Sequence, residues 1–168
     1  MNKLVFAAVV AASLAPAAVL AAASKADRTF ITDAIQGNLA EIQMGQLAQQ
    51  KGQNDAVKSF GQMLVTDHQV NNDKAKQVAS QLGVTPPTQP SAKEKAGYRE
   101  LSKLSGAAFD RQFARMMVTD HKQTIAQFQR EAKRTNDPLR QYASDSLPVL
   151  KKHLDTAEKI ESSKSASR

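Results

Sequence analysis

The feature that most restricts the fold of this chain is a four-residue string that occurs twice. Val-Thr-Asp-His spans Val65–His68 and returns at Val118–His121, and each copy has a phenylalanine eight residues before its histidine. Around both histidines the apolar residues recur every three or four positions, which is the period of one face of an α-helix. The repeat therefore predicts two similar long helices, each with a histidine on the side that faces the core.

The rest of the chain predicts further helices, separated by helix-breaking residues. Tryptophan is absent, glycines are few, and alanine, glutamine and lysine are abundant, which is helix-forming composition. We find no strand-like alternation. Glycines, prolines and capping residues divide the chain into expected helices over residues 24–51, 54–82, 92–104, 107–135 and 137–161.

Residues 85–90 contain three prolines and predict an exposed crossover between the second and third long helices. Four long helices with short first and last connections and a long middle one are typical of two packed hairpins. The sequence therefore predicts an all-α fold, a ferritin-like four-helix bundle whose long crossover carries a short extra helix. The second and third long helices should run parallel.

The two ends of the chain predict export and a short tail. Lys3, an apolar run from Leu4 to Leu20 and the alanines that follow are typical of a cleavable signal peptide over residues 1–23. The bundle should then occupy residues 24–162, with a disordered polar tail at residues 163–168. Cysteine is absent, which excludes disulfides and thiolate metal sites. We expect a periplasmic protein with no transmembrane segment after signal cleavage.

The formal net charge of +7 is compatible with nucleic-acid binding. The cations are, however, scattered along polar helix faces, and aromatic residues make up only 5% of the chain, so no stacking platform is available. The charge pattern predicts a solvated basic surface and no nucleic-acid partner. A second copy of the chain or an envelope protein remains as the expected macromolecular partner.

Polar residues on the inward helix faces fall at one depth. With a rise of about 1.5 Å per residue, His68 and His121 lie roughly 21 and 22 Å from the same end of the bundle, and Glu41 roughly 17 Å from it. His153 falls opposite His121. Buried imidazoles and a carboxylate are costly unless they are paired or bind a cation. These four residues therefore predict a mid-bundle metal site, with zinc favoured because it prefers four nitrogen, sulfur or oxygen ligands.

Asp67 and Asp120 flank this layer, and we expect them to orient the imidazoles or to act as alternate ligands. Our first hypothesis is thus a metal-binding protein that is not an enzyme. A second is an oxidoreductase with a dinuclear iron or manganese site that uses the two aspartates directly. Di-iron bundles carry a glutamate three residues before the histidine, and those positions hold Val65 and Val118 here.

A third hypothesis is a metal-free structural or stress-response bundle that binds an envelope partner, in which the histidines are core residues.

Met44, Met63, Met116 and Met117 lie within about two helical turns of the histidine layer. Thioethers beside imidazoles suit copper, although methionine is also ordinary core filler.

Four segments resemble a known family. They are the two Met-Val-x-Asp-His-like segments, the Ala-Phe-Asp of residues 108–110, and the Leu-Pro-x-Leu-x-x-His-Leu of Leu147–Leu154. They are similar to an exported bacterial family of unknown function, whose members are often labelled outer membrane proteins. The resemblance covers nearly the whole mature chain. It implies a ferritin-like four-helix bundle and a periplasmic location, and it implies no particular activity.

Overall fold

The computed structural model describes residues 23–134 and 137–165, and these residues contain no strand. The helices are α1 (Lys25–Lys51), α2 (Asp55–Gln81), α3 (Ala92–Ser102), α4 (Gly106–Glu131) and α5 (Asp137–Ser165). The predicted all-α fold and the short extra helix in the crossover are confirmed. Within the described residues, none of the helices combines the length and the apolar character that a membrane crossing requires.

Two helix ends differ from the prediction. α5 continues to Ser165, so residues 163–165 are helical and not part of a disordered tail; the hydroxyls of Ser162 and Ser163 donate to carbonyls one turn back. α4 ends at Glu131, because the chain turns where Arg134 pairs with both Glu131 and Asp27. Residues 1–22, which hold nearly all of the expected signal peptide, and residues 166–168 lie outside the described residues.

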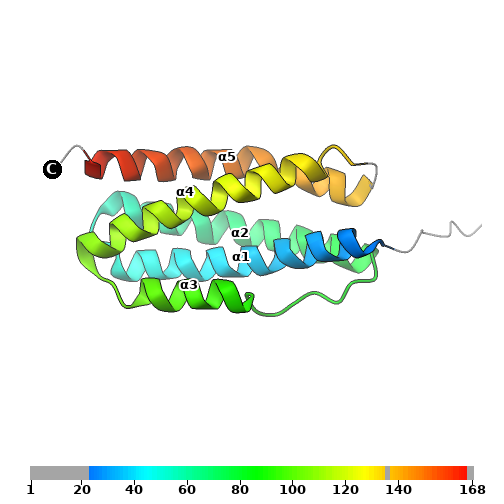
Figure 1. Ribbon diagram of the computed structural model, residues 1–168, viewed down its shortest axis with the longest axis horizontal. Coiled ribbons are helices and arrows are strands. Elements are labelled where there is room, and N and C mark those ends of the chain that lie inside the picture. Colours follow the sequence, from blue (N-terminus) through cyan, green and yellow to red (C-terminus); the bar gives the residue numbers. More distant parts are fainter. Residues whose placement is uncertain (1–22, 135–136, 166–168) are drawn as a thin grey trace, which may run out of the picture.

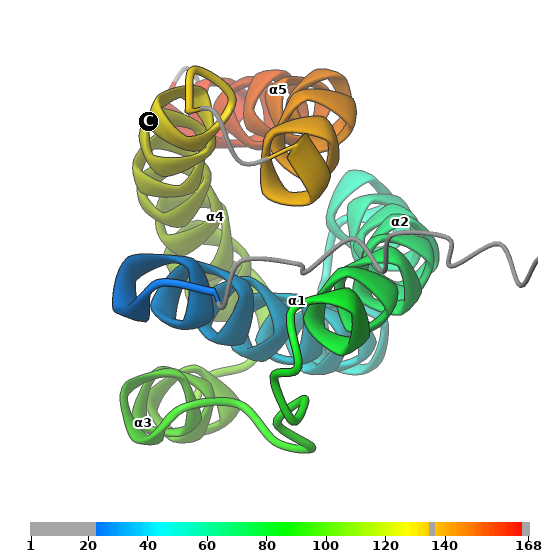
Figure 2. The ribbon, with the colours of Figure 1, turned by 90° about the vertical axis from the view of Figure 1, so that its right-hand side faces the viewer.

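The four long helices form two antiparallel hairpins, α1 with α2 and α4 with α5 (Figure 1). The crossover and α3 return the chain to the end at which α2 began, so α2 and α4 run parallel, as the sequence predicts (Figure 1). Seen along the helices, α2 and α4 lie at opposite corners of the bundle, and α3 lies outside it against α1 (Figure 2). Any group that α2 and α4 share must therefore lie on the bundle axis.

The helix starts follow the capping residues of the sequence. Ser24 and Asp27 form a capping box at α1, and Ser91 and Glu94 form another at α3. The side chain of Asn54 accepts from the backbone N–H of Ala56 at 2.8 Å at the start of α2. These side chains satisfy amide donors that a helix leaves unpaired in its first turn. They fix the depth at which each helix presents its inward residues.

The core consists of two apolar clusters with a polar layer between them. In the cluster near the α1–α2 turn, the phenylalanines of the repeat meet, with ring centroids of Phe60 and Phe113 5.9 Å apart. Phe60 also packs edge-on against His153, at 6.0 Å. Burying each such ring stabilises the fold by roughly 1.5–3 kcal/mol. These clusters hold the backbone on both sides of the histidine layer.

α1 and α2 approach each other closely through two glycines. A Cβ added to Gly45 would lie 2.5 Å from the carbonyl oxygen of Gly61, and a Cβ added to Gly61 would lie 2.6 Å from that of Gly45. Only glycine fits at either position unless the backbones separate. This contact clamps α1 onto α2 about two helical turns from His68, toward the α1–α2 turn.

Candidate metal centre

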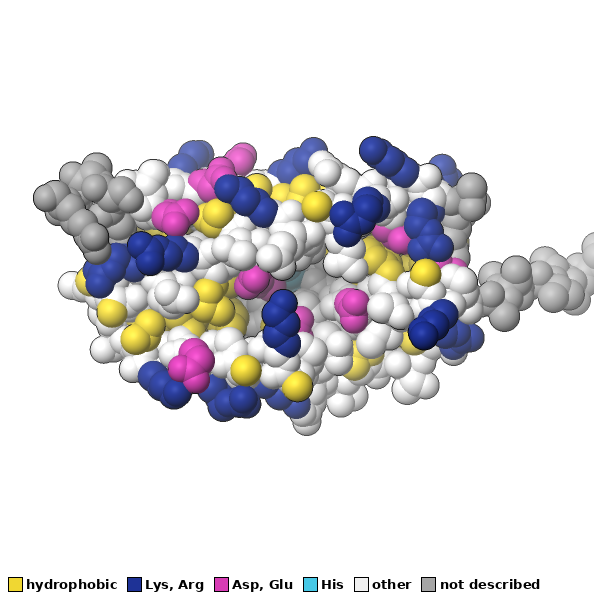
Figure 3. All heavy atoms as spheres, in the orientation of Figure 1, with side chains coloured by type: hydrophobic (Ala, Val, Ile, Leu, Met, Phe, Trp, Pro, Cys, Tyr) yellow, Lys and Arg dark blue, Asp and Glu magenta, His cyan; other side chains and the backbone are white. Residues whose placement is uncertain are grey.

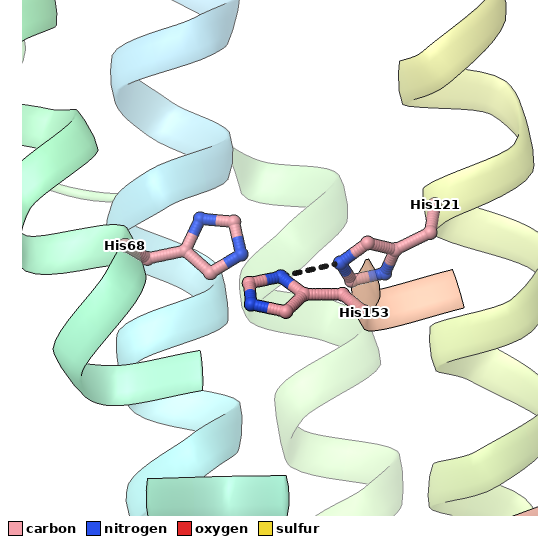
Figure 4. A group of neighbouring side chains, drawn as sticks. All are labelled: His68, His121 and His153. Carbon is pink, nitrogen blue, oxygen red and sulfur yellow. Dashed lines mark hydrogen bonds between the residues drawn. The ribbon is translucent and has the colours of Figure 1, made fainter. Parts of the chain in front are cut away.

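The three histidines lie together at the centre of the bundle. His68 from α2, His121 from α4 and His153 from α5 each offer one ring nitrogen, and these atoms all lie within 4.8 Å of one another. The side chains are 5%, 2% and 0% exposed, respectively. Figure 4 shows the three rings pointing toward one another. The prediction that they share one layer is confirmed. Their common depth follows from where each helix starts and from the constant rise per residue.

The tautomer of His68 follows from its outer hydrogen bond. His68 Nδ1 lies 2.8 Å from Asn38 Oδ1, while the Asn38 amide nitrogen donates to the hydroxyl of Tyr142 at 3.3 Å. Since the amide oxygen can only accept, Nδ1 must carry the proton. Nε2 of the neutral ring then has a free lone pair. That atom is buried and has no hydrogen-bond partner among the described residues.

The other two histidines are oriented in the same way. His121 Nδ1 donates to the Met117 carbonyl at 2.9 Å, and His153 Nε2 donates to Asp67 Oδ2 at 2.9 Å. This leaves His121 Nε2 and His153 Nδ1 without protons and facing each other at 3.3 Å. Two lone pairs at that distance repel unless a cation or a proton lies between them. Two nitrogen ligands of a tetrahedral zinc ion, each about 2.0–2.1 Å from the metal, would be roughly 3.3–3.4 Å apart.

Protons are not readily available to relieve this repulsion. Burial lowers the pKa of His68 well below its ordinary value, and the nearby His153 and His121 lower it further. Burial, followed by the neighbouring His153, lowers the pKa of His121 to about 4. The pKa of His153 is also lowered by burial, against the opposing effect of Asp67. All three rings are therefore neutral near pH 7, the protonation state in which imidazole binds metals.

The three predicted carboxylates do not join this group. The group of converging ligand atoms contains His68, His121 and His153 and none of Glu41, Asp67 and Asp120. Asp67 instead receives the outer hydrogen bond of His153, which is the orienting role that the sequence suggested for it. Glu41 is not one of the three residues whose ligand atoms converge, although it lines the same groove as His68 and His121, so its role as a fourth ligand stays a prediction.

A groove lies beside the histidine layer, and small residues of α1 form part of its lining. Ala34, Gly37 and Ala40 line a groove of about 450 Å³ between α1, α3 and α4, and His68 and His121 lie at its inner end. On the face drawn in Figure 3, acidic side chains surround a hollow about halfway along the molecule. The groove connects the outside of the bundle with two of the three histidines.

Acidic residues line this groove: Asp33, Glu41, Glu94 and Asp120, together with Lys93. Glu41 Oε2 is buried without a hydrogen-bond partner among the described residues. Burial, with contributions from the charges of Asp120 and Glu94, raises the pKa of Glu41 to about 8. Glu41 is therefore mostly protonated at pH 7, and an uncharged carboxyl is a weak metal ligand.

A polar network that the sequence did not assign to the site supports His68. Asn71 donates to the Asn38 amide oxygen at 3.2 Å and to the Tyr142 hydroxyl at 3.1 Å, and it accepts from Ser146 at 2.8 Å. These residues occupy core-facing positions on the helical period, and that was the signal available in the sequence. The network fixes the orientation of Asn38 and, through it, the tautomer of His68.

Comparison with solved structures shows the fold. The chain resembles a structure titled "Crystal structure of DUF305 fragment from Deinococcus radiodurans", with a TM-score of 0.73 and 15% sequence identity over 84% of this chain and 99% of that one. No curated protein matches the sequence. The model of a family described as "Domain of unknown function (DUF4142)" matches residues 12–160. The chain therefore belongs to the DUF4142 family.

Proposed function

We propose that this protein binds one divalent metal ion through His68 Nε2, His121 Nε2 and His153 Nδ1. The observation that carries the proposal is the convergence of three buried ring nitrogens that all lack a proton. Each ring donates its other N–H to a fixed acceptor, the arrangement that orients histidine ligands in metal proteins. The N-terminal pattern of residues 1–23 supports binding in the periplasm.

Zinc is the favoured metal, because imidazole nitrogens suit it and the 3.3 Å separation of His121 Nε2 and His153 Nδ1 fits tetrahedral geometry. Copper and iron also accept imidazole ligands. We further propose a ferritin-like connectivity for the bundle. A dinuclear oxidoreductase has less support, since such sites bridge their metals with carboxylates and none belongs to the histidine group.

The proposal is tested by elemental analysis of untagged mature protein released gently from the periplasm. We expect about one zinc or copper ion per chain, as a single three-histidine site allows. His121→Ala should lose tight binding, while its circular dichroism keeps the helix content. Lys122→Ala, the exposed neighbour on α4, is the matched control and should retain the metal.

Two results would contradict the assignment. Stoichiometric metal in His121→Ala would exclude the histidine site. An absence of metal even after reconstitution would leave a metal-free bundle, in which the histidine layer is only core architecture. About two iron ions per chain would point instead to the dinuclear site of the ferritin-like proteins.

A further inference from the structure

The groove between α1, α3 and α4 reaches the proposed metal on the side away from Asp67 and His153. His68 and His121 line it, whereas His153 does not. His68 Nε2, on a side chain only 5% exposed, has no partner among the described residues. Three histidine ligands leave a tetrahedral metal one open position, as in sites that bind water or a substrate. A ligand that enters through the groove would reach a metal held by His68 and His121.

We propose that the groove binds a small neutral nitrogen donor, such as an imidazole, that completes the coordination of the metal. This inference rests on the proposed function. The groove volume of about 450 Å³ lies in the range of small-molecule pockets, roughly 300–1,000 Å³. Its apolar wall, which includes Met44, Met116 and Phe128, suits the carbon atoms of such a ligand.

The charge of the groove selects the chemical class of the ligand. Asp33, Glu94 and Asp120 line it against the single ammonium group of Lys93. A cleft with an excess of carboxylates repels anions, whereas a neutral molecule meets no such barrier. An inorganic anion, the other common fourth ligand of such metals, is disfavoured here. Glu41, half-buried in the same wall, offers a carboxyl group that can hydrogen-bond the ligand.

The experiment uses the full mature chain loaded with cobalt(II), whose visible absorption reports its coordination. Imidazole and azide are titrated separately into the loaded protein. We expect imidazole to change the spectrum saturably, with a half-saturation concentration at least about tenfold lower than that of azide, a difference of about 1.4 kcal/mol. An unresponsive spectrum, or tighter binding of azide, would overturn the inference.

A plugged groove provides the second arm. A Cβ at Gly37 would meet only Glu94 Oε1, at 3.9 Å, so Gly37→Leu introduces a side chain into the groove without a backbone clash. We expect cobalt to remain bound while imidazole affinity falls about tenfold or more. Gln43→Leu, at an exposed position on the same helix, is the control. Equal imidazole affinity in the two variants would refute the groove as the binding site.

The charge argument has its own pair of variants. Asp33→Asn with Glu94→Gln should weaken the preference for imidazole over azide, whereas Asp145→Asn with Asp155→Asn on α5, outside the groove, should preserve it. An unchanged preference in the first pair would overturn the assigned ligand class. If the wild-type protein binds no cobalt at all, the metal site itself is refuted and the inference falls with it. A cobalt-loaded protein that ignores imidazole refutes only the inference.

Discussion

Glu41 makes the stability of the metal-free protein depend on pH in a way that one substitution isolates. Its Oε2 is buried without a partner, and burial together with Asp120 and Glu94 raises its pKa from 4.5 to about 8. Between these pH values the unfolded chain releases the proton and the folded chain keeps it. Stability therefore falls as pH rises through this window, by about 1.4 kcal/mol per pH unit from this group.

Glu41→Gln keeps the size and hydrogen-bonding capacity of the side chain and removes its titration. Near pH 4 the two proteins should be about equally stable, because both side chains are neutral. By pH 8 and above the variant should be more stable by up to about 5 kcal/mol, from the displacement of the Glu41 pKa to about 8. Water that enters the groove would reduce this gain.

Urea unfolding with a chelator present, at several pH values from 4 to 9, measures the difference. Glu158→Gln is the control, because that glutamate forms an exposed ion pair with Lys122 and its loss should cost no more than about 1 kcal/mol. A stability difference between Glu41→Gln and wild type that does not grow with pH would refute the reasoning. It would mean that the Glu41 carboxylate is solvated or paired in the folded protein.

Further perturbations test the packing and the site. Gly61→Ala should cost about 1–3 kcal/mol of unfolding free energy, because its Cβ meets the Gly45 carbonyl; unchanged denaturation would contradict the close approach of α1 and α2. Asn38→Ala releases the N–H of His68 and should weaken metal binding about 10–100-fold in calorimetry, and an unchanged affinity would show that the outer bond is dispensable. Acid should destabilise the metal-free protein. A histidine whose pKa is lower in the folded than in the unfolded chain contributes stability above pH 6.5, and this stability is lost as pH falls through the pKa of the folded state. The stability advantage of wild type over His121→Gln should therefore shrink by up to about 3 kcal/mol between pH 6.5 and about 4, and a constant difference would contradict neutral burial.

Local rules were sufficient to predict the helices and the histidine layer. Capping residues such as Ser24, Asn54 and Ser91 determine where the helices begin, and the helical period determines which residues face inward. Together with a constant rise they give the depth of each inward side chain. The meeting of His68 and His121 across the bundle follows from these rules alone.

Depth, however, does not give the lateral distance between helices. Glu41 is expected among the ligands because it lies near the correct depth, and in the folded protein it lines a groove beside His68 and His121. The groove is lined by residues of α1, α2, α3 and α4, which are far apart in the sequence, and no short-range pattern encodes how they pack. For the same reason the sequence did not predict the hydrogen-bond network of Asn71 and Tyr142, whose members come from three helices.

The two copies of the repeat make different contacts in the folded protein, and the difference lies in their aspartates. Asp67 and Asp120 precede equivalent histidines, yet Asp67 bonds His153 of α5, whereas Asp120 lines the groove beside α1. There, loss of solvent raises the pKa of Asp120 despite the nearby Lys93. α5 brings a histidine to the polar layer, and α1, its counterpart across the bundle, brings Asn38 and an uncharged carboxyl. A pocket of about 120 Å³ lies between α2 and α5 beside Asp67 and His68, whereas the larger groove of about 450 Å³ opens on the α1 side. The larger opening is the one through which the proposed three-histidine site would take a further ligand.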